Sequence, residues 1–330
     1  MSEVAATDAS PASAAAGTAT PASATAPTAT ARLLEGAPIA REIRAGVAAD
    51  VQAFVATHGF VPTLAIVVCG SDAPSMVYLR QILNGCEKVG IGGRLVEVLY
   101  DEADTGGSAG RLLEAIQALN ADRQVAGIIV QMPLPRGISL RTVIETIDPA
   151  KDIDGIHPLN NGLVRLGYEG FVPATAHAVI EIIKQSGLPI AGKDAVIIGR
   201  SPVVGLPAAT LLVKENATVT VCHSRTADLA GHVRRADIVV VAAGQPGLVT
   251  GAMLKPGAVV VDVGINVVGG RITGDVDFES AAAVASAITP VPGGLGPLTN
   301  ALLLAHLIHA AQRQAAGPAQ TPAVTRGVIS

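Results

Sequence analysis

The chain is poor in aromatic and charged residues. It has no Trp among its 330 residues, aromatics make up only 2%, and charged residues make up 15%. Proteins that bind single-stranded nucleic acid stack bases on aromatic side chains, and duplex binders carry a basic stripe. With a net charge of -4, this chain is not expected to bind nucleic acid, although a single nucleotide cofactor stays open.

Cysteines are few, and the histidines form no cluster at metal-binding spacing. Cys69, Cys86 and Cys222 are odd in number, scattered and set in apolar surroundings. We therefore expect buried, reduced thiols, no disulfide framework and no metal site, which favours a cytoplasmic location. His306 and His309 have no neighbouring carboxylate in the sequence, and we interpret them as residues on the face of a helix.

Long apolar runs are also missing, so we expect no membrane partner. No stretch reaches the length of a membrane span without Gly, Pro or a charge. Residues 1–32 are almost entirely Ala, Thr, Pro and Ser, and residues 315–330 have a similar character. Such segments have little large apolar surface to bury, and we expect both to be disordered. The leader lacks the basic start and apolar run of a secretory signal.

Apolar residues make up 49% of the chain, and its length fits two domains. Short apolar runs alternate with segments of helical periodicity, a βαβ rhythm that predicts α/β domains with parallel sheets covered by helices. We predict an N-terminal α/β domain over residues 33–155 and a Rossmann-like domain over 156–298. A last helix over 299–314, with Thr299 as its N-cap, is expected to pack back on the first domain. The predicted strands are 64–68, 95–99, 126–130, 195–198, 217–221, 238–242 and 258–263.

Residues 194–205 have the pattern of a buried strand, a glycine turn and the start of a helix. This arrangement points backbone N–H groups and the positive end of a helix at a phosphate. The spacing from Gly199 to Gly205 is G-x-S-x-x-x-G, not G-x-G-x-x-G, so an ordinary strand-to-helix turn is the alternative. The next strand ends in His223-Ser224-Arg225 and not in a carboxylate. Hydroxyl and guanidinium groups there favour NADP over NAD.

Further polar residues follow other predicted strands. Gln131 opens a loop that two prolines make rigid, either as a site residue or as a loop cap. Asp152 and Asp154 could bind a ring nitrogen or an amino group by charge-assisted bonds, and a helix cap followed by a turn is equally possible. Residues 262–266 place backbone groups where a nicotinamide amide could bind. The Pro/Gly-rich residues 289–299 allow close approach to a flat ligand or form a hinge.

Taken together, six segments resemble the methylenetetrahydrofolate dehydrogenase/cyclohydrolase family. They occur in the family's order, and the resemblance runs from about Leu33 to Ala311. The segments are Gln131-Met-Pro-Leu-Pro135, Lys151-Asp-Ile-Asp-Gly-Ile-His-Pro158, Gly199-Arg-Ser201 with Gly205, Cys222-His-Ser-Arg-Thr226, Asp262-Val-Gly-Ile-Asn266 and Thr289-Pro-Val-Pro-Gly-Gly294.

The resemblance implies a folate in the cleft between two domains, NADP on the second domain and a homodimer. It implies oxidation of methylenetetrahydrofolate to the methenyl form, then addition of water to give formyltetrahydrofolate, in one-carbon metabolism. Carried over by position, the expected NADP contacts are Gly199, Arg200, Ser201, Ser224 and Ile265, and the expected folate-site residues are Tyr78, Gln131 and Asp154.

One position departs sharply from the family's pattern. In the family, a lysine four residues after the tyrosine is the general acid–base that activates water, and Ile82 stands at that position here. Arg80 is only two positions from Tyr78 and so lies on a different helix face. Loss of such a group typically costs about 10²–10⁴ in rate. Residues 173–177 also differ, since the family usually has Pro-Cys-Thr-Pro there.

The two half-reactions should suffer unequally from Ile82. Hydride transfer depends mainly on the positioning of the methylene donor against the nicotinamide, whereas addition of water needs a proton carrier. We therefore expect dehydrogenase activity with little cyclohydrolase activity. The alternatives are a non-catalytic folate or NADP binder and a Rossmann dehydrogenase for another substrate.

Overall fold

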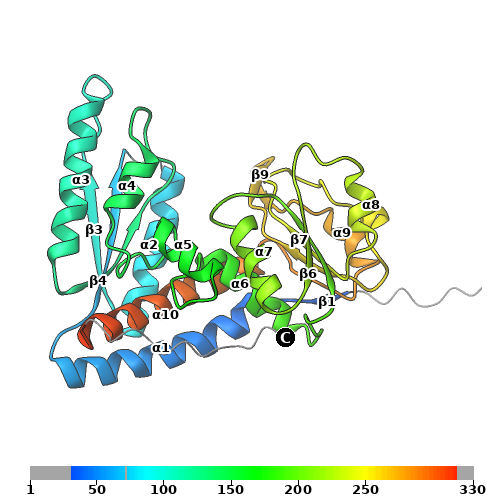
Figure 1. The fold of residues 1–330 in the computed structure, drawn as a ribbon, viewed down its shortest axis with the longest axis horizontal. Coiled ribbons are helices and arrows are strands. Elements are labelled where there is room, and N and C mark those ends of the chain that lie inside the picture. Colours follow the sequence, from blue (N-terminus) through cyan, green and yellow to red (C-terminus); the bar gives the residue numbers. More distant parts are fainter. Residues whose placement is uncertain (1–30, 71–72, 318–330) are drawn as a thin grey trace, which may run out of the picture.

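The structure is a computed structural model that describes residues 31–70 and 73–317. Most of the predicted disordered leader and tail lies outside these residues. The chain forms two lobes. The long helices α1 (Gly36–His58) and α10 (Leu295–Ala315) lie side by side beneath the first lobe, and their N-terminal parts pack against the second (Figure 1). None of the helices in these residues combines the length and apolar character that a membrane crossing requires.

The first lobe contains a parallel sheet with the order β3-β2-β4. The central strand, β2 (Thr63–Cys69), is buried beyond its first residue because helices cover both faces. Leu64 and Ile66 enter a core shared with α1, α2 and α10, whereas Ala65 and Val67 enter the core against α3 and α4. This alternation is the two-residue period of a strand. The other elements are α2 (Ala73–Val89), β3 (Gly92–Val98), α3 (Thr105–Ala121), β4 (Val125–Val130) and α4 (Leu140–Thr146).

The second lobe contains a parallel sheet with the order β1-β11-β8-β7-β5-β6. Apolar cores lie on its two faces, one against α6 and α7 and the other against α8 and α9. The predicted strands and parallel pairing are thereby confirmed. The elements are β1 (Arg32–Leu33), α5 (Pro158–Arg165), α6 (Ala174–Gln185), β5 (Asp194–Ile198), α7 (Gly205–Lys214), β6 (Thr218–Cys222), α8 (Leu229–Val233), β7 (Ile238–Val241), the 3-10 turn η1 (Gly251–Met253), β8 (Val259–Asp262), β9 (Asn266–Val268), β10 (Arg271–Thr273), α9 (Phe278–Ala282) and β11 (Ala287–Ile288).

Two features of the chain ends differ from the sequence-based expectation. The prediction that Thr299 caps the last helix is wrong, because α10 begins at Leu295 after Gly294, and the Thr299 hydroxyl donates to the Leu295 carbonyl at 3.1 Å. Pro297 is tolerated there because N–H groups of the first helical turn have no partner within the helix. The two-residue strand β1 pairs with β11 of the second lobe, so the described chain starts there and crosses to the first lobe through α1.

Candidate functional site

The loop from β5 into α7 brings three backbones into close contact. Gly199 has a φ of 120°, and a Cβ atom there would collide with the carbonyl of Ala242, which follows β7. A Cβ atom on Gly205 would collide with the carbonyl of Gly199. The Ser201 hydroxyl accepts from the Val204 N–H at 3.1 Å. The first residue of α7 therefore lies directly against the residue that follows β5, so the N-terminus of α7 is next to the β5–α7 loop.

The segment after β6 offers cationic and hydroxyl groups at the neighbouring strand end. The His223 N–H donates to the Thr226 hydroxyl at 2.8 Å, which shapes the turn. Ser224, Arg225 and, from the β5 loop, Arg200 are exposed, and residues 223–227 contain no carboxylate. These residues fit a dinucleotide with a 2′-phosphate, because a ribose-binding acid would repel that phosphate.

Two aspartates fix the ends of β7 and β8. Asp262 is buried, and its carboxylate accepts N–H bonds from Gly264 at 2.9 Å and Val276 at 2.9 Å. Asp275 accepts from Ala243 at 2.6 Å and from the Asn266 amide at 2.8 Å. Burial raises the pKa of Asp262, and the N–H bonds oppose that rise. These contacts shape the loop that carries Ile265, which is 72% exposed.

Sequence reasoning missed the role of Asp275. The residue follows β10, and its partners Ala243 and Gly244 lie 32 and 31 positions earlier in the chain. The available local signal is the pair Gly269-Gly270, which forms the turn before β10 with φ of 57° and 77°. That signal locates the hairpin but not the strand end to which Asp275 returns.

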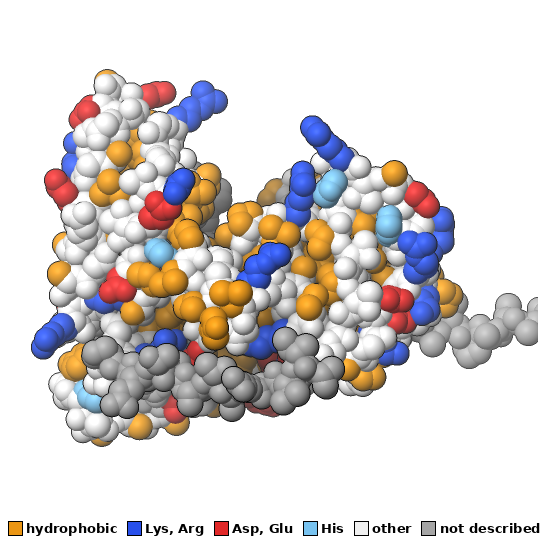
Figure 2. All heavy atoms as spheres, viewed as in Figure 1, with side chains coloured by type: hydrophobic (Ala, Val, Ile, Leu, Met, Phe, Trp, Pro, Cys, Tyr) orange, Lys and Arg blue, Asp and Glu red, His pale blue; other side chains and the backbone are white. Residues whose placement is uncertain are grey.

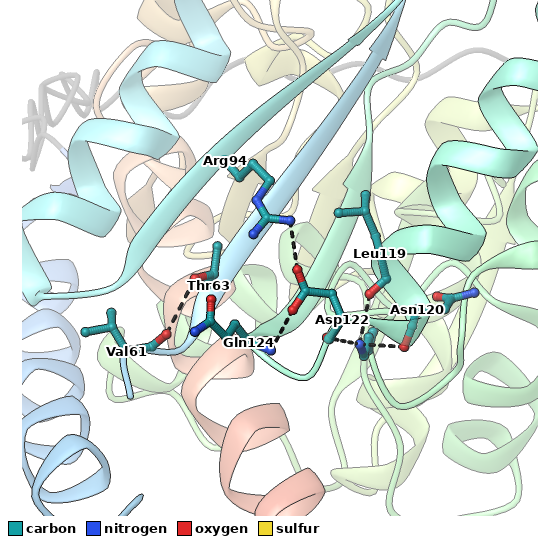
Figure 3. A network of polar contacts seen from close by, with 8 residues as sticks. Val61, Thr63, Arg94, Leu119, Asn120, Asp122 and Gln124 are labelled. Carbon is teal, nitrogen blue, oxygen red and sulfur yellow. Dashed lines mark hydrogen bonds and ion pairs between the residues drawn. The ribbon is translucent and has the colours of Figure 1, made fainter. Parts of the chain in front are cut away.

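In the first lobe, Lys151 anchors the loop that carries Asp152 and Asp154. Its ammonium group is buried and donates to the carbonyls of Leu119, Asn120 and Asp122 at 2.9, 2.7 and 2.7 Å. These carbonyls lie at the C-terminal end of α3, where a cation is favoured (Figure 3). Burial lowers the pKa of Lys151, and the carboxylates of Asp148 and Asp122 oppose that effect.

The two aspartates of this loop have different roles. Asp152 is buried and accepts from the Ile156 and His157 N–H groups and from the Asn160 amide, at 3.1, 2.8 and 2.8 Å. It therefore holds the turn that leads into α5, whose N-cap is His157. Asp154 has no such bond to another described residue. Burial, followed by the nearby Asp152 charge, raises its pKa to about 7. The described residues hold no cluster of three metal-ligating side chains.

Gln131 and Ile82 lie in the same lobe. Gln131 follows β4, and its amide donates to the carbonyl of Met132 at 2.6 Å. Ile82 is 1% exposed and belongs to the same buried cluster as Ile153, the residue before Asp154. Arg80 is exposed, as expected for a different face of α2. Tyr78 lies in α2.

A cavity of about 600 Å³ lies between α2 and the Pro/Gly-rich loop that leads into α10. Figure 2 shows the notch between the two lobes. Gln81, Asn84 and Lys88 line the cavity from the first lobe, and Ile265 lines it from the second. Because Ile265 is an expected NADP contact, the cavity extends from α2 to the expected NADP site. Among the described residues, its lining does not include Gln131 or Asp154.

His306 and His309 both lie on the helix α10, as the sequence predicts. A carboxylate from a distant segment also faces one of them, because His309 Nε2 lies 3.1 Å from Glu169 Oε1. Glu169 is 140 positions away in the chain, so no local pattern could predict the pair. The three cysteines are free and buried, as predicted.

The comparisons with known proteins agree with this arrangement. Residues 34–154 match the model of the tetrahydrofolate dehydrogenase/cyclohydrolase catalytic domain, and residues 173–315 match that of the corresponding NAD(P)-binding domain. The Bifunctional protein FolD of Roseiflexus sp. (strain RS-1) is 48% identical over 285 residues, which cover 86% of this chain and 97% of that protein.

The chain belongs to the tetrahydrofolate dehydrogenase/cyclohydrolase family. Two solved structures of this family are similar. The bifunctional enzyme FolD from Campylobacter jejuni is 40% identical with a TM-score of 0.81, and the alignment covers 86% of this chain and 99% of that one. The Trypanosoma brucei dehydrogenase-cyclohydrolase, complexed with NADP cofactor and inhibitor, is 37% identical with a TM-score of 0.81 and coverage of 87% and 99%.

Proposed function

We propose that this chain is an NADP-dependent methylenetetrahydrofolate dehydrogenase of one-carbon metabolism with a weakened cyclohydrolase step. The observation that carries the proposal is the close-packed turn at Gly199 beside a β6 end that lacks a carboxylate, in a chain of this family. A non-catalytic binder has less support, because the similar relatives are named as bifunctional enzymes.

NADP would lie along the strand ends of the second lobe. Gly199, Arg200 and Ser201 would hold the pyrophosphate with the start of α7, and Ser224 would contact the 2′-phosphate. Ile265 would pack against the nicotinamide end. When bound, NADP supplies the hydride acceptor. The role of the chain is to hold the folate's methylene carbon against that acceptor and to exclude water.

The folate would lie along α2, with its acidic end in the cavity and its pterin beyond the cavity lining, at the Asp154 loop. Asp154 would accept hydrogen bonds from the pterin, with Gln131 and Tyr78 completing that part of the site. Lys88 and Arg44 line the cavity, and their charges suit the acidic end of a folate. Release of a hydride needs no side chain to take a proton, so the missing lysine leaves this step intact.

The cyclohydrolase step lacks its proton carrier. Ile82 cannot accept or donate a proton, and its burial among apolar residues leaves no ordered water site at its side chain. Water addition to the methenyl product would then proceed mainly without side-chain catalysis.

We further propose domain boundaries at residues 33–155 and 156–298, with α10 packed on the first domain, and a homodimer in the cytoplasm. The dimer is supported by the edge strand β6 and a neighbouring groove of about 550 Å³. Leu166 and Val213 line this groove and are 72% and 58% exposed, and Figure 2 shows apolar side chains gathered near α5 and α7. The cytoplasm is supported by the three free, buried thiols.

A direct assay tests the proposal. Purified full-length protein is mixed with methylenetetrahydrofolate and either NADP or NAD, and the reduced cofactor is followed spectrophotometrically. NADP-dependent formation of the methenyl product supports the proposal. Tight folate and NADP binding without turnover would favour the non-catalytic alternative.

A further inference from the structure

A half-buried pair of histidines links the two lobes to the loop that carries Asp154. His177 lies in the first turn of α6, and His306 lies in α10. His177 Nδ1 is 3.2 Å from His306 Nε2, and the two rings are within 10° of parallel. The other nitrogen of His306, Nδ1, lies 3.0 Å from the carbonyl oxygen of Ile153, which directly precedes Asp154.

The partners fix where the protons lie. A carbonyl oxygen only accepts, so His306 Nδ1 carries a hydrogen and donates it to Ile153. In the neutral ring, Nε2 then accepts, and His177 Nδ1 must be the donor. Burial lowers the pKa of His306 to about 4, and burial also lowers the pKa of His177. The result is a chain of hydrogen bonds with one direction, from α6 through α10 to the carbonyl of Ile153.

Charged groups flank the pair without breaking this chain. Glu181, on α6, lies 3.8 Å from His177 Nε2, and Lys184 follows one turn later. On the other side, His309 and Arg313 of α10 share Glu169 at 3.1 and 3.5 Å. The centroid of the Phe171 ring lies 6.0 Å from that of His306 and 6.2 Å from that of His309.

The orientation of the Ile153 carbonyl determines the direction of the Asp154 carboxylate. Lys151 and Asp152 are anchored by their own side chains, whereas Asp154 makes no such bond to another described residue. Rotation of the peptide between Ile153 and Asp154 would turn the Asp154 carboxylate. The hydrogen bond from His306 is the side-chain contact that holds this peptide among the described residues.

We propose that His306 is a positioning residue: through the Ile153 carbonyl it orients Asp154 toward the folate, and His177 fixes the tautomer of His306 that can do so. The proposal rests on the proposed function for the identity of the ligand. It assigns to both histidines an effect on folate binding and not on NADP binding.

The test compares His306→Ala, His306→Asn and His309→Ala in the full-length protein. The amide Nδ2 of Asn can replace the Nδ1 donor, so it should restore the bond to Ile153. His306→Ala should raise the KM for methylenetetrahydrofolate and the Kd for tetrahydrofolate about three- to tenfold, with the KM for NADP within about twofold. His306→Asn should return both folate constants to within about twofold of those of the unmodified protein. The control variant His309→Ala should have folate constants within the same twofold range.

Equal increases in the folate and NADP constants, or an Asn variant as impaired as the Ala variant, would overturn the proposal. If His306→Ala does not fold, His177→Ala carries the test, since it leaves His306 in place but free to change tautomer, and an unchanged folate Kd would then refute the relay. Tetrahydrofolate binding is measured by calorimetry without turnover. Failure of the dehydrogenase proposal is therefore seen separately, as absent activity in the unmodified protein.

Discussion

At the scale of single residues, Ile82 is the side chain that separates the two half-reactions. It lies on the same face of α2 as Leu79 and Cys86, and all three are buried. A lysine at this position would extend from an apolar wall near the Asp154 loop. Burial would lower its pKa toward the range in which an amine can exchange protons with water.

Ile82→Lys should therefore raise hydrolysis of methenyltetrahydrofolate by about tenfold or more. It should also lower the free energy of unfolding by about 1–3 kcal/mol, because a polar amine would be buried where Ile82 makes apolar contacts. The control is Ile82→Met, which has a long flexible side chain but no amine. Equal hydrolysis rates in a folded Lys variant and the Met variant would contradict the assigned role of this position.

Asp154 gives a pH dependence with a definite sign. Its folded-state pKa is raised to about 7 from the ordinary aspartate pKa of 3.8. The folded protein therefore holds a proton that the unfolded chain releases between these two values. Stability should therefore fall as pH rises from about 4 to about 7 and then level off. Asp154→Asn should remove this loss and stabilise the protein at pH 8 by roughly 4 kcal/mol.

The same variant should lose dehydrogenase activity, since an amide cannot replace the carboxylate as a double acceptor for the pterin. Urea unfolding at pH 5 and pH 8 measures the stability, and steady-state kinetics measures the activity. A variant whose stability advantage is the same at both pH values would show that Asp154 does not titrate in this window.

Individual site residues were predictable only where the chain pattern is local. Gln131 follows a strand that its apolar run reveals, and Asp154 belongs to the short polar segment Lys151–Pro158. Asp275, the His177–His306 pair and the partners of Lys151 are contacts between distant segments, and no periodicity encodes them. The two aspartates at positions 152 and 154 were indistinguishable in sequence, because only the packing of α5 decides which of them caps N–H groups.

At the scale of elements, the β5–α7 turn requires a residue without a side chain at position 199. Gly199→Ala places a methyl group against the Ala242 carbonyl at a positive φ. We expect the KM for NADP to rise at least about tenfold while the Kd for tetrahydrofolate stays within about twofold, because the distortion lies in the second lobe.

Gly257→Ala is the matched control for backbone strain. Gly257 also has a positive φ, of 82°, but no atom lies within 4 Å of a Cβ placed there. It should therefore share a modest loss of stability, about 1 kcal/mol, without the loss of NADP affinity. A similar rise in the KM for NADP in both variants would attribute the effect to general destabilisation.

The helix α3 and the Asp154 loop are joined by one buried cation. Lys151→Met removes three hydrogen bonds and leaves the carbonyls of Leu119, Asn120 and Asp122 without their partner. We expect a loss of about 2–4 kcal/mol in the free energy of unfolding. Lys184→Met, which removes the exposed pair with Glu215, should cost less than about 1 kcal/mol. Urea titrations measure both, and equal losses would show that Lys151 is not an anchor.

Element types followed from the sequence more reliably than their ends. The run Leu64–Val68 predicted β2 because a strand buried on both faces is apolar throughout. The start of α10 was misplaced by four residues because Thr299 has the chemistry of a cap but lies one turn inside the helix. The strand β1 is too short to show a period, and its pairing with β11 depends on the whole sheet.

At the scale of the whole molecule, the proposed dimer uses the free edge of the second lobe. Val213→Asp would place a charge in the groove beside β6 and should shift the protein from dimer to monomer. Leu99→Asp is the control, because Leu99 is 82% exposed on the other lobe. Sedimentation velocity measures the mass. An unmodified protein that sediments as a monomer, or a Val213 variant that stays dimeric, would contradict this assignment.

The central claim is that one chain keeps hydride transfer and has lost most catalysed hydration. The most direct measurement is an assay of both steps on a single preparation, first with methylenetetrahydrofolate and NADP and then with methenyltetrahydrofolate alone. We predict NADP reduction with accumulation of the methenyl product, and hydrolysis of added methenyltetrahydrofolate close to the rate in buffer. Rapid enzymatic hydrolysis, or no NADP reduction at all, would contradict the account.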